Sequence, residues 1–224
     1  MSGISQRRLA KLLKVNRKTV VRKFIFLGVY AAHFLKEDRH AYETSDEIEF
    51  DDLETFEHSK LKPISVTMAV EAGTRRILGF RVAQMPAKGL LVARSLKKYG
   101  PRKDERKQKR QDLFREIKAF VSDTATIKSD ENPHYIKDVK MFFPKATHKV
   151  FKGRRGCVVG QGELKAGGYD PIFSLNHSFA MFRANINRLF RKTWNTTKLK
   201  ERLALQIAMY SLYHNLEIIQ NPSR

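Results

Sequence analysis

The chain has 224 residues and a mass of 26.0 kDa, enough for one domain with a small appendage. Its 44 Lys and Arg outnumber its 23 Asp and Glu, and the net charge of +21 indicates a polyanionic partner such as nucleic acid. The 42% apolar content excludes wholesale disorder, and no apolar run approaches the ~18 residues of a membrane span. The single cysteine, Cys157, excludes an internal disulfide and a cysteine-based zinc ribbon. Without a signal-peptide pattern, we expect a cytoplasmic, nucleoid-associated protein that does not contact membranes.

The first 27 residues predict two short helices, over 5–14 and 17–27, with Val15 and Asn16 as the break. Ser5 and Asn16 stand where each helix needs an N-cap. Two helices joined by a tight turn are typical of a DNA-binding helix-turn-helix. An ordinary amphipathic helical hairpin is the alternative. We expect DNA contacts from four residues near the start of the second helix: Arg17, Lys18, Thr19 and Arg22.

A boundary is predicted after the linker that follows these helices. Residues 28–47 continue as helix and then as an acidic connection. The sequence therefore predicts a helix-turn-helix segment with its linker helix over 1–44, and a second domain over 45–224.

Three strands are predicted next, over 47–56, 64–71 and 75–85, with a tight turn at 72–74. Short connections make them an antiparallel meander. The remaining elements are a helix over 112–123, a strand over 126–129, a helix over 135–143, a strand over 147–151, and helices from 176 and over 201–219. This order predicts an α/β fold, a ribonuclease H-like mixed sheet flanked by helices.

Acidic residues are concentrated where the first strand begins, with ten of the 23 acids between positions 37 and 57. Asp51 lies within that strand, and Asp130 ends the fourth strand. In a ribonuclease H-like sheet these two strands are neighbours, so we expect the two carboxylates to meet. Hard oxygen ligands on rigid strands suit Mg²⁺, with Mn²⁺ as a substitute.

The segment from 173 to 198 predicts a basic helix that begins at Asn176. Seven bases and one acid lie between positions 183 and 202, which favours contact with DNA phosphates. We expect those contacts from Arg183, Arg188, Arg191 and Lys192.

Four segments together resemble the compact bacterial insertion-sequence transposases of the DDE type. They are DDLETFEHSKLKP, TRRILGF, IKSDENPHY and the series N-x6-R-x4-R-L-x-R-K-T-W-x3-K, and the resemblance runs from about residue 47 to 215. It implies a homodimeric enzyme on double-stranded DNA that cleaves element ends and joins the strand to target DNA by two-metal phosphoryl transfer. Asp51 and Asp130 would hold the metal, with Asp52 in support. Many members begin with a zinc ribbon, which this sequence lacks.

The third metal ligand departs from the family pattern, because Asn176 stands where a Glu is common. Three interpretations are open. The Asn176 amide oxygen is the ligand, Asn176 only caps its helix, or the third carboxylate is Glu163 or Asp170. His177 is a further possibility, although a histidine beside an apolar helix face is more typical of a structural role.

Other classes of protein fit parts of the same sequence. A helix-turn-helix transcriptional regulator with a ligand-sensing domain would need neither Asp51 nor Asp130. A degenerate or truncated transposase would bind DNA without cutting it, and a ribonuclease H-like nuclease would cut without strand transfer.

Overall fold

The computed structural model describes residues 4–152, 168–189 and 197–219. The helices are α1 (Gln6–Leu12), α2 (Arg17–Asp38), α3 (Val92–Tyr99), α4 (Arg106–Ile117), α5 (Pro133–Phe142), α7 (Phe173–Asn185) and α8 (Lys200–Tyr213). The strands are β1 (Ser45–Phe56), β2 (Pro63–Glu71), β3 (Ile77–Gln84), β4 (Val121–Asp130) and β5 (Thr147–Phe151). Within the described ranges, no helix is both long and apolar enough to cross a membrane.

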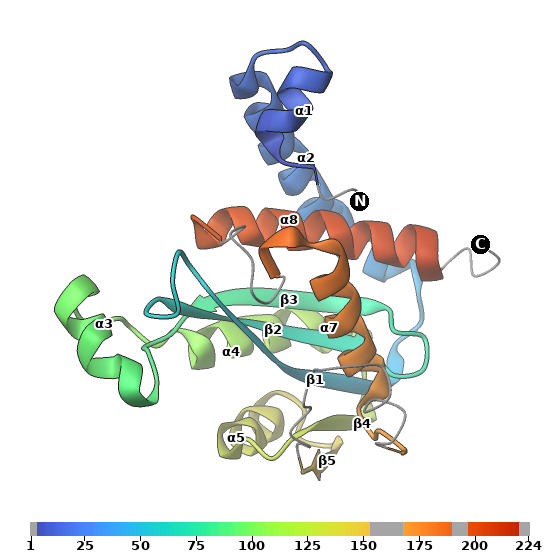
Figure 1. Ribbon diagram of the computed structural model, residues 1–224. Helices are drawn as coiled ribbons and strands as arrows, with labels where there is room; N and C mark the ends of the chain where they lie inside the picture. Colours follow the sequence, from blue (N-terminus) through green and yellow to red (C-terminus); the bar gives the residue numbers. More distant parts are fainter. Residues whose placement is uncertain (1–3, 153–167, 190–196, 220–224) are drawn as a thin grey trace.

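The five strands form one mixed sheet in the order β3-β2-β1-β4-β5 (Figure 1). β1, β2 and β3 make the expected antiparallel meander, while β4 runs parallel to β1 and β5 parallel to β4. Parallel neighbours need a crossover, and α4 and α5 supply it. Strand order and helix placement together are those of a ribonuclease H-like fold, as predicted.

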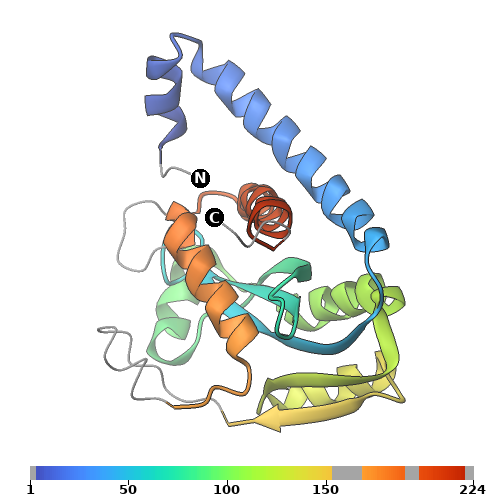
Figure 2. The ribbon, with the colours of Figure 1, turned by 90° about the vertical axis from the view of Figure 1, so that its right-hand side faces the viewer.

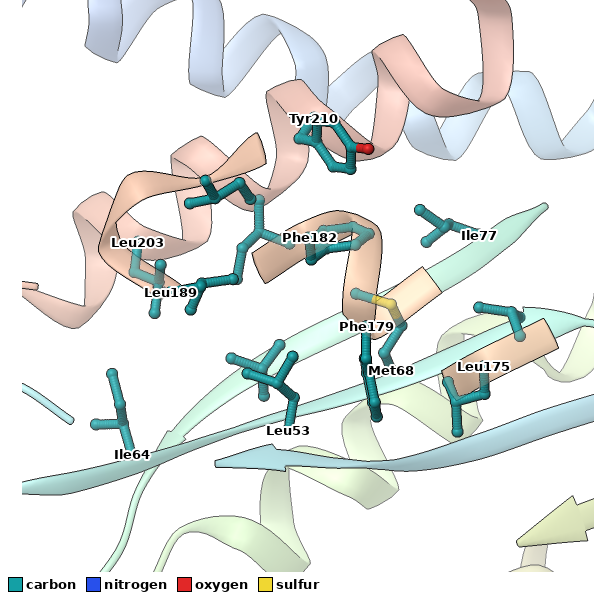
Figure 3. Packing of buried hydrophobic residues seen from close by; sticks show 14 residues of the cluster. Leu53, Ile64, Met68, Ile77, Leu175, Phe179, Phe182, Leu189, Leu203 and Tyr210 are labelled. Carbon is teal, nitrogen blue, oxygen red and sulfur yellow. The ribbon is translucent and has the colours of Figure 1, made fainter. Parts of the chain in front are cut away.

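Helices cover both faces of the sheet, because alternate residues of its central strands are apolar toward each side. On one face Ile48 and Phe50 of β1 pack with Phe114 of α4 and Tyr135 of α5. On the other face α7 and α8 pack on the sheet (Figure 3). There Leu53 of β1 faces a cluster that includes Met68, Phe179, Phe182 and Tyr210.

The two N-terminal helices form as predicted, with both caps in place. Ser5 Oγ accepts a hydrogen bond from Arg8 N at 3.2 Å, and Asn16 Oδ1 accepts one from Lys18 N at 2.8 Å. α2 continues past residue 27 to Asp38, as predicted for the start of the following segment, and its C-terminal half packs on α8 (Figure 2). A Cβ at Gly28 would lie 2.5 Å from Leu205 Cβ, so glycine permits this close approach.

Several boundaries predicted from the sequence were wrong. The helix placed at 112–123 is α4, which begins at Arg106 and ends at Ile117, and β4 starts at Val121 rather than 126. α3 was not predicted. The helix placed from Asn176 begins at Phe173 and ends at Asn185.

Candidate active site

Asp51 and Asp130 lie on neighbouring parallel strands. The pairing of β1 with β4 sets Glu49 opposite Lys128. Two residues further along each strand, the same register leads to Asp51 and Asp130, whose side chains share a face because strand side chains alternate with a period of two. Both aspartates are half-buried. The predicted adjacency of these two strands is confirmed.

Two hydrogen bonds from the chain segment after β4 orient these carboxylates. The Tyr135 hydroxyl donates to Asp51 Oδ1 at 3.0 Å, and the Asn132 backbone N–H donates to Asp130 Oδ1 at 3.0 Å. Asn132 also caps α5, since its Oδ1 accepts from His134 N at 3.1 Å. The start of α5 is therefore fixed to both aspartates.

Tyr135 is itself held rigidly. Its side chain is 1% exposed and its ring packs against Phe50, with the centroids 4.8 Å apart. The Arg110 guanidinium lies over the same ring, 4.8 Å from its centroid. Burial and the nearby carboxylates raise the pKa of the Tyr135 phenol, which keeps it protonated as a donor to Asp51.

Burial and repulsion between neighbouring carboxylates raise the pKa values of both aspartates, which disfavours having both ionised at once. Burial first, and then the Asp130 carboxylate, raise the pKa of Asp51 to about 7. Burial and the Asp52 carboxylate raise the pKa of Asp130. Asp52 itself accepts a hydrogen bond from Thr67 on β2. A pair of carboxylates in this state is stabilised by any divalent cation that neutralises it.

The raised pKa of Asp51 predicts a pH-dependent stability without metal. The folded state binds the Asp51 proton more tightly than the unfolded chain, whose ordinary pKa is 3.8, so stability present below that pH is lost as pH rises to about 7. D51N avoids this loss, since Asn stays neutral and still accepts from Tyr135. In EDTA at pH 8, the free energy of unfolding of D51N should exceed that of the wild type by at most about 4 kcal/mol. Denaturant unfolding should show that this difference in free energy shrinks toward pH 4. A difference that does not depend on pH would contradict the role given to Asp51.

The N-terminus of α7 is anchored to β1 through Glu49. This side chain is 3% exposed, and its Oε2 accepts a hydrogen bond from the Leu175 backbone N–H at 2.8 Å. Burial raises the pKa of Glu49, while the Leu175 bond and Lys128 lower it, and the Asp170 carboxylate raises it. Asp170 therefore lies near Glu49, and Glu49 is on β1, the strand that carries Asp51.

Asp170 and Asn176 are joined in the same region. Asp170 Oδ1 accepts from Ile172 N at 3.1 Å, and its Oδ2 accepts from Asn176 Nδ2 at 2.9 Å. The interpretation of Asn176 as a helix cap was wrong, because α7 begins at Phe173 with Ile172 at the cap position. Asn176 lies one turn inside the helix and is exposed. Asp170, three residues before α7, is thus tied to the first turns of that helix through Asn176 and the Ile172 backbone.

Glu163 and His177 are the remaining candidates for a third metal ligand. Glu163 lies outside the described residues. The His177 ring nitrogens contact the Arg75 guanidinium at 3.3 and 3.4 Å, and burial and this cation lower the pKa of His177. Among residues 4–152, 168–189 and 197–219, no three Asp, Glu, His or Cys side chains are grouped to hold a metal ion. Within these ranges, two carboxylates form the centre of the site.

The predicted DNA contacts of the helix-turn-helix are all exposed. Arg17, Lys18 and Thr19 form the first turn of α2, and Arg22 follows one turn later. Val20 is buried, as expected for the side that packs inward. A basic, solvent-facing first turn suits phosphate or base contact.

The predicted contacts near α7 are more varied. Arg183 and Arg188 are half-buried, and the Arg188 guanidinium lies over the Phe24 ring of α2, 5.7 Å from its centroid. Burial and Arg202 lower the pKa of Arg188. Arg191 and Lys192 lie outside the described residues.

Sequence reasoning missed Tyr135 and Glu49. Both carried a usable signal. Glu49 is two residues before Asp51, so a strand puts both on one face. Tyr135 is the third residue of a helix capped by Asn132, and a buried phenol needs a hydrogen-bond partner.

Comparison with known proteins gives a weak likeness of fold. No protein-family model and no curated protein sequence match the chain. The crystal structure of the catalytic domain of Mos1 mariner transposase is similar over 88% of this chain and 94% of that one, at 10% identity and a TM-score of 0.30. The Mos1 mariner paired end complex with Mn is similar over 98% of this chain and 75% of that one, at 8% identity and a TM-score of 0.31. The fold assignment itself rests on the strand order and helix placement of this chain.

Proposed function

We propose that the chain is a DNA transposase that cuts element ends and joins the strand to target DNA with bound Mg²⁺. The observation that carries this proposal is the pair Asp51 and Asp130, side by side on parallel strands and oriented by α5. The +21 charge and the exposed basic turn of α2 supply attraction to DNA. Residues 1–44 would bind DNA and residues 45–224 would carry the chemistry, in a homodimer.

Each part of the site then has a role in that reaction. Asp51 and Asp130 would hold the metal, and Asp170, just before α7, or Asn176, within it, would supply the third ligand. When bound, the metal supplies activation of the attacking oxygen and stabilisation of the leaving oxygen. Tyr135 and Asn132 each donate to one oxygen of an aspartate, which would orient the two carboxylates toward the cation. Glu49 holds α7 against β1.

A cleavage and joining assay tests this proposal. The full chain is incubated with labelled duplexes that carry the element ends, with Mg²⁺, with Mn²⁺ or with EDTA. The expected products are a nicked end and a longer joined strand, both absent in EDTA. Cleavage without joining would support a nuclease. Products that form in EDTA would overturn the metal-dependent assignment.

A second candidate is a degenerate transposase that binds DNA without cutting it. One observation favours it: the residue at the family's third acidic position, Asn176, has its amide nitrogen bonded to Asp170. The assay separates the two, because this protein would retard DNA in a gel and yield no product. Restoring the acid through N176E should then raise cleavage, while leaving DNA binding within about fivefold, since one added charge is worth under about 1 kcal/mol at the surface.

Y135F should weaken metal binding while preserving the fold. It deletes only the hydroxyl that orients Asp51, and loss of a side chain that supports a metal ligand typically costs about 10–100-fold in metal affinity or activity. Thermal shift with Mn²⁺ should show the midpoint of stabilisation moving to roughly tenfold higher concentration. Y99F, on an exposed helix away from the site, is the matched control. Equal metal titrations for Y135F and the wild type would contradict the orienting role.

A further inference from the structure

α2 carries a stripe of exposed aromatic side chains, formed by Phe26, Tyr30 and Phe34. These side chains are 62%, 47% and 42% exposed. They follow one another at four-residue spacing, and their ring centroids are 6.3 and 4.2 Å apart. A row at this spacing lies along one side of a helix. Large aromatic rings in water are costly, and a contiguous row of them marks an interaction surface.

The stripe faces away from the rest of the protein. Gly28, Ala31 and Leu35 form the buried side of the same helix, and Gly28 meets Leu205 of α8. Figure 2 shows α1 and α8 on one side of α2 and the other side open. Among the described residues, nothing in the chain covers the stripe.

The stripe is symmetric about Tyr30 in shape, and the charges beyond its two ends are opposite. Phe26 and Phe34 each lie four residues from Tyr30, and Lys23 and Glu37 each lie seven residues from it, all on the exposed side of α2. If a second α2 is laid antiparallel with the two Tyr30 residues in register, Phe26 meets Phe34 of the other copy. Lys23 then meets Glu37 of the other copy at both ends. The surface is complementary to itself, which is the property of a two-fold interface.

We propose that two copies of this chain associate through their α2 helices, antiparallel and centred on Tyr30. The aromatic stripe forms the apolar seam, and the Lys23–Glu37 pairs close its ends and set its register. Each copy carries +21, which opposes association at long range, so we expect the dimer to be reversible. This interface is independent of the proposed catalysis and needs neither DNA nor metal.

Sedimentation of the full chain without DNA or metal tests the seam. The wild type should show a concentration-dependent equilibrium between one and two copies. The F26S and Y30S double variant should raise the dissociation constant more than about 100-fold, because four rings, two from each copy, leave the interface. Both positions are exposed, so the far-ultraviolet circular dichroism should match the wild type. A wild type that stays monomeric, or a double variant that dimerises equally, would overturn the proposal.

Charge exchange tests the register. K23E and E37K should each raise the dissociation constant roughly tenfold, since each sets like charges opposite one another at both ends. The K23E and E37K double variant should return to within about threefold of the wild type, as the pairs are restored. Net charge alone predicts otherwise, because K23E lowers the repulsion between copies and E37K raises it. K36E makes the same charge change as K23E from an exposed position off the stripe, and should not weaken the dimer.

A different result from these charge-exchange variants would point to another surface of the chain. A dimer indifferent to K23E and E37K would be held by a different surface, and the α2 interface would be rejected. Loss of DNA cleavage in any of these variants would not bear on the result, because association is measured without DNA.

Discussion

Replacing either Asp51 or Asp130 by Asn should lower metal-dependent DNA cleavage by at least about a thousandfold. A metal ligand supports several kcal/mol of transition-state stabilisation, and each 1.4 kcal/mol is a factor of ten in rate. Asn keeps the shape of the side chain and, at position 51, its bond from Tyr135. Single-turnover cleavage of a labelled element end in Mg²⁺ measures the loss.

Matched controls separate this effect from a general loss of charge. D46N changes an exposed acid on β1, and D123N changes an exposed acid on β4 that pairs with Lys145 at the surface. Both should cleave within about twofold of the wild type, because exposed pairs contribute under about 1 kcal/mol. D51N and D130N should bind duplex DNA at least as well as the wild type, since each removes a negative charge. Cleavage that survives both substitutions would end the assignment of these residues.

The meeting of these two strands could be predicted because the sequence carries a separate signal for each. β1 alternates Ile48 and Phe50 with acids, and β4 ends at an Asp before a loop that starts with Glu131. Strand order then follows from the fold class. The parallel pairing of Glu49 with Lys128 is its consequence.

The contacts that complete the site could not be predicted in this way. Tyr135 reaches Asp51 across 84 residues of sequence, and Leu175 reaches Glu49 across 126. Such bonds depend on how far each helix lies along the sheet. A helical pattern fixes which side of a helix is buried but not its position along the strand that it covers.

The predicted ends of helices and strands were wrong where charged residues concealed the helical pattern. α4 starts at Arg106 inside a run that is dense in Lys and Arg, and only from Leu113 do its apolar residues become frequent. Val121 and Ala125 continue the apolar series of α4, but they belong to β4 and are buried in the core. Pairing of Ser45 with Val121 decides that boundary, and the pairing is not local.

The buried ion pair between Arg110 and Asp138 is the second place where one substitution should have a large effect. Both side chains are at most 3% exposed. Arg110 Nε donates to Asp138 Oδ2 at 2.8 Å, and Gln111 Nε2 donates to Asp138 Oδ1 at 2.8 Å. The pair joins α4 to α5 directly beneath Tyr135. It therefore supports the helix that orients Asp51.

D138N or R110M should lower the free energy of unfolding by about 3–5 kcal/mol, because each leaves a buried group without its counter-charge. That is a large part of the ~5–15 kcal/mol by which a domain is stable. D112N is the control, since Asp112 pairs with Arg115 at the surface and should cost under about 1 kcal/mol. Denaturant unfolding gives all three values.

A double variant that carries both R110M and D138L tests whether the Arg110–Asp138 ion pair places Tyr135 or only stabilises the junction of α4 and α5. Apolar residues of similar volume remove both charges at once, so the double variant should be more stable than either single variant. It also removes the guanidinium over the Tyr135 ring. If the pair serves mainly to place Tyr135, the double variant should fold well and yet bind Mn²⁺ more weakly, as Y135F does. If the double variant binds Mn²⁺ as the wild type does, the pair stabilises the junction of α4 and α5 and has no part in placing Asp51.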